Sequence, residues 1–159
     1  MFWFEDIPMN ERTVLGEYTF TEENIIAFAK KYDPQVFHLD AEAAKATAFG
    51  GLVASGWHTL SAWIKLLIDH RERMAAEFGE DMPNRTGVSP GLRQVRWYLP
   101  VRPNTTLIYD YTTVGKKDWP SRPLLGLVER TCEARSADGT LYLSFVNLAL
   151  LRRRPVPSI

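Results

Sequence analysis

The order of hydrophobic patterns along the chain is the feature that most constrains its fold. Helical spacing of apolar residues dominates the first half, and strand-like alternation dominates the second. Helices followed by a run of strands favour an α+β architecture over alternating strand and helix units. The 159 residues suffice for one core, and we find no internal repeat or linker, so residues 1–159 are expected to form a single domain.

Two short helices are predicted early in the chain. Thr21 is a suitable N-cap for the first. That helix should end before Asp33, because a residue that precedes proline is disfavoured in the helical conformation. Asp40 should cap the second helix, over residues 41–46, which the Phe-Gly-Gly of residues 49–51 ends.

A third, longer helix is predicted to begin at Ser55-Gly56, to run toward Glu77 and to stop at Gly79. Its apolar residues recur at helical spacing and cover a wide surface, so we expect it to be buried on most sides. These residues are Leu60, Ala62, Trp63, Ile64, Leu66, Leu67 and Ile68.

Five segments show strand-like alternation. The first, residues 12–20, precedes the helices and has Val14 among its predicted inward positions. The others are residues 91–99, 105–114, 124–135 and 140–151. Asp138-Gly139 joins the last two as a hairpin signal. With the long helix, these segments predict a curved antiparallel sheet wrapped around a central helix.

Charge and cysteine content exclude several classes of protein. Lys+Arg and Asp+Glu are 19 each, so no net positive charge favours binding to nucleic acid or acidic lipid. The N-terminus has no signal-peptide pattern, and no apolar stretch approaches the roughly 18 residues of a membrane span. A lone Cys132 excludes an internal disulfide and suits a reducing compartment. We therefore expect a cytoplasmic protein without membrane or nucleic-acid partners, with Cys132 as a small buried residue.

Residues with chemical potential gather between positions 32 and 58. Asp33 and His38 lie five apart, and a carboxylate beside an imidazole is an acid–base pair. The spacing alone favours a plainer alternative, in which Asp33 caps a turn and His38 is an ordinary loop histidine. Ser55-Gly56 leaves a similar choice. Its free N–H groups could stabilise an oxyanion, or the two residues could simply cap the helix and admit close packing.

The same segment resembles the MaoC-like acyl dehydratases, the family of (R)-specific enoyl-CoA hydratases. The resemblance rests first on Asp33-Pro34-Gln35-Val36-Phe37-His38-Leu39-Asp40, which has the family's Asp, proline turn and His-x-Asp. It is extended by Ala48-Phe49-Gly50-Gly51-Leu52-Val53-Ala54-Ser55-Gly56-Trp57-His58 and by Trp97-Tyr98-Leu99-Pro100-Val101-Arg102-Pro103, similar to a strand ending in Pro-Val-x-Pro. With these motifs, the acid–base interpretation of Asp33 and His38 becomes the favoured one.

The resemblance implies a hotdog fold and a homodimer or larger homo-oligomer with an acyl-CoA tunnel at the subunit interface. It implies reversible hydration of a 2-enoyl thioester of CoA or acyl-carrier protein, without metal or redox cofactor. Asp33, His38 and Gly56 would be catalytic, with His38 activating the water, Asp33 moving the Cα proton and the Gly56 N–H binding the oxyanion. The substrate would contact a second set of residues, namely Phe37, Phe49, Ser55, Trp57 and His58.

Two departures from the family pattern stand out, of which the first lies at a turn and the second bears on chain-length preference and activity. Asn104-Thr105 replaces a common Gly-Asp, and Ser55 and Ile64 stand where some hydratases have His and Ser. His58 could also face the substrate, although packing is the favoured role.

Several alternatives stay open. The runner-up activity is a hotdog thioesterase, and the second is a non-catalytic acyl-thioester binding module. Basic residues that could bind CoA phosphates are Arg93, Arg96, Arg102, Lys116, Lys117 and Arg152 to Arg154.

Overall fold

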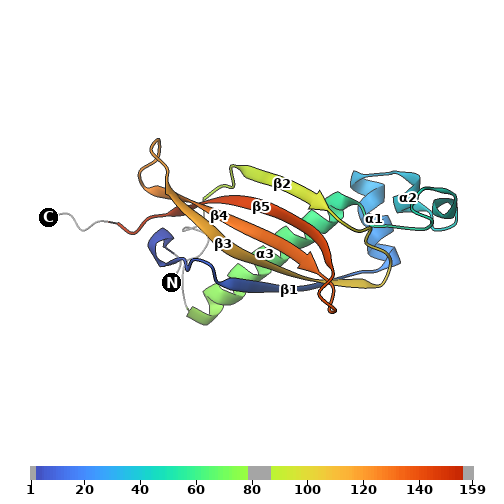
Figure 1. Cartoon of the computed structure of the whole chain (residues 1–159), viewed down its shortest axis with the longest axis horizontal. Helices are drawn as coiled ribbons and strands as arrows, with labels where there is room; N and C mark the ends of the chain where they lie inside the picture. Colours follow the sequence, from blue (N-terminus) through green and yellow to red (C-terminus); the bar gives the residue numbers. More distant parts are fainter. Residues whose placement is uncertain (1–2, 79–86, 156–159) are drawn as a thin grey trace.

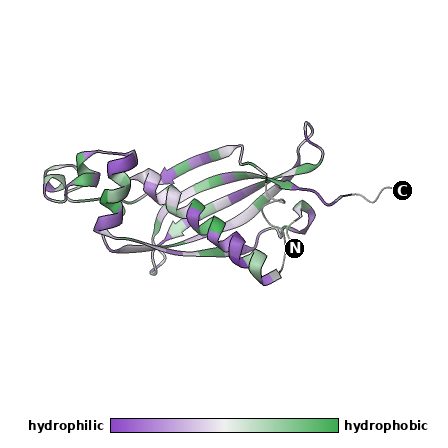
Figure 2. Cartoon of the chain, turned by 180° about the vertical axis from the view of Figure 1, so that it is seen from behind, coloured by the Kyte–Doolittle hydropathy of each residue, from purple (hydrophilic) through white to green (hydrophobic). Residues whose placement is uncertain are grey.

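The fold is one antiparallel sheet with a long helix lying across one of its faces. The structure is a computed structural model and describes residues 3–78 and 87–155. The sheet order is β1-β3-β4-β5-β2 and all neighbours are antiparallel. The strands are β1 (Arg12–Phe20), β2 (Gly91–Trp97), β3 (Thr105–Asp118), β4 (Leu125–Arg135) and β5 (Leu141–Arg152). Helix α3 (Gly56–Phe78) crosses the sheet diagonally (Figures 1 and 2), which confirms the predicted α+β arrangement.

The short helices gather at one end of the sheet, beside the start of α3 (Figure 1). They are α1 (Glu22–Tyr32), α2 (Val36–Leu39) and the 3-10 turn η2 (Ala43–Ala46), while another 3-10 turn, η1 (Phe4–Asp6), lies near the N-terminus. As predicted, Thr21 caps α1 by accepting a hydrogen bond from the Asn24 N–H (3.2 Å). The predicted helix over residues 41–46 proves to be the shorter η2, capped by Asp40. The prediction of a loop around His38 was wrong, because one helical turn, α2, holds that residue.

Helix α3 begins at Gly56 as predicted but is buried on one side only. Leu60, Trp63 and Leu67 face the sheet and are buried. Ile64 is 46% exposed and Ile68 41% exposed, so the expectation of burial on most sides was wrong. The sheet covers one face of the helix, and these two residues lie on the other. Gly79, the predicted stop, lies outside the described residues.

Two bulges alter which strand residues face inward. A register shift between Val14 and Gly16 in β1, with Gly16 at φ +144°, turns Leu15 inward and leaves Val14 exposed, contrary to the prediction. In β2 a shift between Arg93 and Arg96 accompanies a positive φ at Gln94. The strand expected over residues 91–99 ends at Trp97, and its apolar residues Leu92 and Trp97 are exposed, whereas Val95 packs against the core.

The main core lies between α3 and the sheet. Its largest fully buried side chains include Phe20, Tyr109 and Phe145, and Trp63 from α3 packs edge-on to Phe145 at 4.9 Å. Cys132 is buried there, as predicted, and burial raises the pKa of its thiol to about 12. Asp138-Gly139 forms the predicted hairpin turn between β4 and β5, with Gly139 at φ +87°. In the described parts of the chain, no helix combines the length and apolar character needed to cross a membrane.

Candidate active site

The turn after α1 brings Asp33 and His38 together. Asp33 ends α1 with its N–H bonded to the Ala29 carbonyl (2.9 Å), and Pro34 then directs the chain into α2. The Val53 N–H donates to the Phe37 carbonyl (3.0 Å), which ties α2 to the segment before α3. Asp33 and His38, five residues apart in the sequence, therefore lie close together across a tight turn.

His38 is buried and faces Asp33 with one ring nitrogen. It is 6% exposed, and its Nε2 lies 3.4 Å from Asp33 Oδ2. Its Nδ1 lies 2.7 Å from the Val53 carbonyl, which can only accept, so Nδ1 carries the proton. In the neutral ring the Nε2 lone pair is therefore directed toward the carboxylate, and a water that donates to both atoms would satisfy the arrangement.

Asp33 is held as an anion by two donors. The Ser55 hydroxyl donates to Oδ2 (2.6 Å), and the Gln35 amide donates to Oδ1 (2.8 Å). The Ser55 hydrogen bond is the main cause that lowers the Asp33 pKa below its ordinary value. Partial burial opposes this shift, and Gln35 and His38 support it. The carboxylate is consequently ionised at neutral pH.

The start of α3 forms another wall of the site. Ser55 Oγ accepts from the Trp57 N–H (3.2 Å), and the Gly56 N–H, as the first in the helix, has no intrahelical acceptor. A Cβ on Gly56 would meet the Trp97 ring at 2.7 Å, and the Trp97 indole N–H donates to the Gly56 carbonyl (3.2 Å). The expectation that Gly56 admits close packing is therefore confirmed. Its role toward an oxyanion stays a prediction.

A cavity of about 440 Å³ joins these groups. It is lined by six of the eight residues predicted from sequence, namely Asp33, Phe37, His38, Phe49, Gly56 and Trp57. Ser55 does not line the cavity, but its hydroxyl donates a hydrogen bond to Asp33, which does. The remaining lining, which includes Gln35, Thr59, Trp97, Tyr98 and Leu99, was not singled out as part of the site.

His58 lies outside that lining, although the sequence placed it among the substrate contacts. It stacks on Phe28 (4.5 Å between centroids), and its Nε2 lies 3.2 Å from the Tyr18 hydroxyl. Burial lowers the His58 pKa to about 4, so the ring is neutral at physiological pH. This is the packing role that the sequence favoured for it.

Gln35 and Trp97 are the two contacts that sequence reasoning missed most clearly. Gln35 had a signal, because it lies two residues after Asp33 in a proline turn, where a side chain can fold back on its neighbour. No local signal in the sequence indicated that Trp97 contacts Gly56, because the two residues are 41 positions apart. Among residues 3–78 and 87–155, no three His, Cys, Asp or Glu side chains converge as metal ligands would.

Comparison with known proteins agrees with this site and fold. The family model described as "MaoC like domain" matches residues 6–127. An uncharacterised protein of Bacillus subtilis, YdeM, is 30% identical over 108 residues, which are 68% of this chain and 69% of that protein.

Solved structures agree as well. A MaoC-like dehydratase from Rhodospirillum rubrum has a TM-score of 0.80 at 29% identity, over 98% of this chain and 99% of its own. A protein from Archaeoglobus described as a monoamine oxidase regulatory protein has a TM-score of 0.82 at 28% identity, over 96% and 95%. An (R)-hydratase from A. caviae, at 18% identity and a TM-score of 0.66 over 95% and 99%, shares the fold alone. By family model, relative and hotdog architecture together, this chain belongs to the MaoC-like dehydratase family.

Proposed function

We propose that this protein reversibly hydrates a 2-enoyl thioester to a 3-hydroxyacyl thioester, by family resemblance the (R) isomer. The observation that carries the proposal is the 3.4 Å approach of the His38 Nε2 lone pair to the ionised Asp33 carboxylate at a cavity wall. A proton acceptor and a second proton carrier then stand side by side, as addition of water across a double bond requires.

His38 and Asp33 together can account for both proton transfers that hydration requires. His38 Nε2 takes a proton from the bound water as its oxygen forms the bond to Cβ. Because Asp33 is ionised in the resting site, it has no proton of its own to give. The imidazolium therefore passes the same proton to Asp33, which delivers it to Cα. Water is consumed, both groups return to their starting state, and the reverse sequence is dehydration.

The thioester oxygen gains negative charge when Cβ is attacked, and it needs a donor. The Gly56 N–H at the first position of α3 can supply one, and the helix dipole adds to it. Phe37, Phe49 and Trp57 would contact the acyl group, because their rings line the same cavity.

The carrier end of the substrate would lie near Arg102 if it bears a phosphate. Arg102 donates to the Phe49 carbonyl beside the cavity, whereas three other basic candidates form ion pairs with carboxylates. Arg154 pairs with Asp6 (2.6 Å), Lys117 pairs with Glu129 (2.8 Å), and Arg153 pairs with Asp118. Among the basic residues weighed from sequence, Arg102 is the one hydrogen-bonded to a residue that lines the cavity at Asp33 and His38.

We further propose a homodimer or higher homo-oligomer whose interface covers the cavity mouth. Trp57 is 63% exposed, and Trp97, Tyr98 and Leu99 are exposed beside it. Adjacent apolar side chains of this kind mark contact surfaces more often than free ones. Sedimentation velocity should find no monomer at micromolar concentration, and a monomer that still turns over substrate would contradict this arrangement.

The first test is the loss of enoyl-thioester absorbance with crotonyl-CoA, with a thiol trap run in parallel. We expect absorbance to fall without thiol release in the wild-type protein. His38→Ala should abolish the fall, because the water loses its proton acceptor. Leu39→Ala, one residue further along α2, is the control and should retain activity, since Leu39 does not line the cavity.

The other outcomes identify the alternatives. Thiol release would identify a thioesterase, for which Asp33 would be the carboxylate near the helix. Binding of crotonyl-CoA, hexenoyl-CoA and a branched enoyl-CoA without turnover would leave the binding module as the function.

A further inference from the structure

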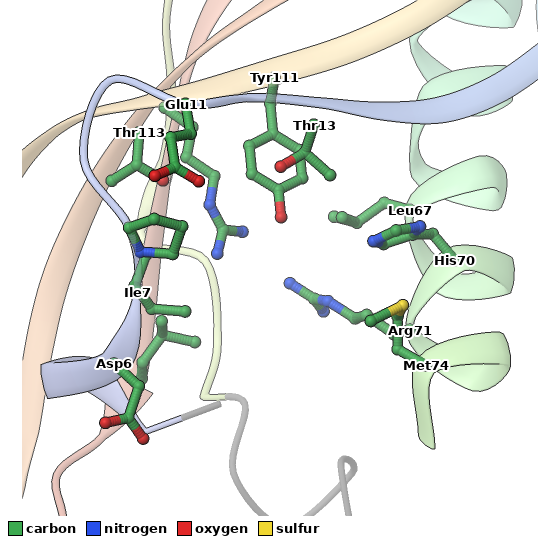
Figure 3. A pocket seen from close by; sticks show the side chains of 13 residues that line it. Asp6, Ile7, Glu11, Thr13, Leu67, His70, Arg71, Met74, Tyr111 and Thr113 are labelled. Carbon is green, nitrogen blue, oxygen red and sulfur yellow. The ribbon is translucent and has the colours of Figure 1, made fainter. Parts of the chain in front are cut away.

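A second cavity, of about 400 Å³, lies between the sheet and the C-terminal half of α3. It shares no lining residue with the cavity at Asp33 and His38. Gly56 lines the first cavity and Arg71 the second, so about 20 Å of helix separates them. Figure 3 shows Arg71 reaching from the helix toward the middle of this space, with Tyr111 reaching into it from β3.

Arg130 is the unusual member of the lining. It occupies a helix-facing position of β4 between Val128 and Cys132, both fully buried, and is itself 4% exposed. Its Nε and Nη1 have no hydrogen-bond partner, and the described residues offer it no ion pair. The contact it does make is with the Tyr111 ring, 4.5 Å from the guanidinium carbon. Because arginine stays protonated, the position holds a buried, uncompensated charge.

A second arginine adds to this charge instead of neutralising it. Arg71 also lines the cavity, and burial together with the positive Arg130 lowers the Arg71 pKa to about 10. His70 adds no charge, since burial and the nearby arginines lower its pKa. Of the two lining carboxylates, Asp6 is engaged by Arg154 (2.6 Å). The other, Glu11, forms no ion pair within the described parts of the chain.

The other residues that line the cavity indicate what kind of ligand could balance this positive charge. Ile7, Leu67, Met74 and Leu151 form an apolar side, and the hydroxyls of Thr13, Tyr111 and Thr113 lie beside the arginines. We propose that this cavity is a second ligand site, which binds the anionic head of a small amphiphilic molecule between Arg71 and Arg130 and its short apolar body against Met74 and Leu67. Guanidinium groups bind carboxylate and phosphate with paired hydrogen bonds, so the anionic group of the ligand can be either of these.

The probes are hexanoate, hexyl phosphate and neutral hexanol, titrated into protein labelled with ¹³C at the methionine methyl groups. The Met74 methyl lines the cavity, whereas Met9 is exposed and lies outside the lining, so it is the internal reference. We expect both anions to shift the Met74 signal but not that of Met9, with hexanol at least about tenfold weaker. The tighter of the two anions identifies the head group.

Arg71→Met and Arg130→Met should each weaken anion binding by about tenfold or more. Arg135→Met is the control on the same strand as Arg130, because Arg135 is paired with Glu133 (2.8 Å) and lies outside the cavity. Three results would overturn the proposal: no shift at Met74 at millimolar anion, hexanol binding as well as hexanoate, or binding that survives both cavity variants. The Met74 readout in the wild-type protein keeps the test decisive even if one variant does not fold.

Discussion

The polar groups of the two cavities at the ends of α3 differ in whether they have partners within the chain. At the N-terminal end Asp33, His38 and Ser55 are each hydrogen-bonded or ion-paired within the chain. Toward the C-terminal half, Arg130 is buried and Arg71 half-buried, and neither forms an ion pair with the described residues. A site whose groups are already partnered is held in position before substrate arrives. An unpartnered charge lowers stability until something from outside the chain binds it.

Asp33→Asn should have the largest effect of the substitutions considered, and the effect should be on activity at the site of Asp33, His38 and Ser55. The amide keeps the size of the carboxylate and can still accept from Ser55, but it cannot carry the proton between His38 and Cα. Hydration of crotonyl-CoA should fall by about 10²–10⁴-fold. The folded protein should also lose the stability that the lowered Asp33 pKa provides at neutral pH. Asp40→Asn is the matched control, because Asp40 caps η2 and does not line the cavity. Retained hydration in Asp33→Asn would refute the proton relay.

His58→Phe should remove much of the loss of stability in mild acid. Because the folded pKa of His58 is about 4, below the ordinary value near 6.5, the unfolded chain binds this proton first. The native protein therefore loses about 2–3 kcal/mol through this group as pH falls from 6.5 toward 4. Urea unfolding at several pH values should show a flatter curve for the variant across that window. An equally steep curve would mean that other groups cause the loss.

Arg130→Met should raise stability, which is the reverse of what most buried substitutions do. It replaces an unpartnered charge with an apolar chain of similar length, and we expect a gain of about 1–2 kcal/mol in the free energy of unfolding. Arg135→Met, which removes a paired and more exposed arginine, should change it by no more than about 0.5 kcal/mol. Thermal unfolding without added anion checks both. A destabilised Arg130→Met would show that the contact with Tyr111 outweighs the buried charge.

Ser55→Ala should give the smallest effect, at the partnered end. Without the Ser55 hydroxyl, the Asp33 pKa should rise from its lowered value, because that hydrogen bond is the main cause of the shift. In the wild-type protein Asp33 contributes stability that is present above its unfolded pKa and is lost as pH falls through the folded one. The variant should lose part of it, together with about 1 kcal/mol for the helix cap. A ¹³C titration of the Asp33 carboxyl carbon measures the change directly, and an unchanged midpoint would contradict the assignment.

Local signals in the sequence predicted much of the N-terminal site. The threonine cap at Thr21, the proline after Asp33 and the glycine at position 56 each act over a few residues, so the ends of α1 and the start of α3 followed from them. The proximity of Asp33 and His38 needed the family resemblance, because α2 is a single turn that periodicity cannot detect.

What the sequence could not supply depends on long-range placement. Alternation put Val14 inward, but the bulge before Gly16 turned Leu15 in its place. Helical spacing included Ile64 in the core, although only one face of α3 is covered. Arg130 in a strand is typical of an outward-facing residue, and only the register of β4 against its neighbours places it inside. The second cavity had no signal for the same reason.

The position of β1 in the sheet has a consequence for how this protein is made. Arg12 pairs with Thr112, which follows 100 residues later, and β2 pairs with β5 beyond β3 and β4. At about 5–20 residues per second, roughly 5–20 s of synthesis separates β1 from its only neighbour among the described strands. During that interval α3 is synthesised, before most of the sheet that covers its apolar face. The meander of β3, β4 and β5 is the first part that can pair locally, so the earliest strand to be synthesised must wait for the third before it can join the sheet.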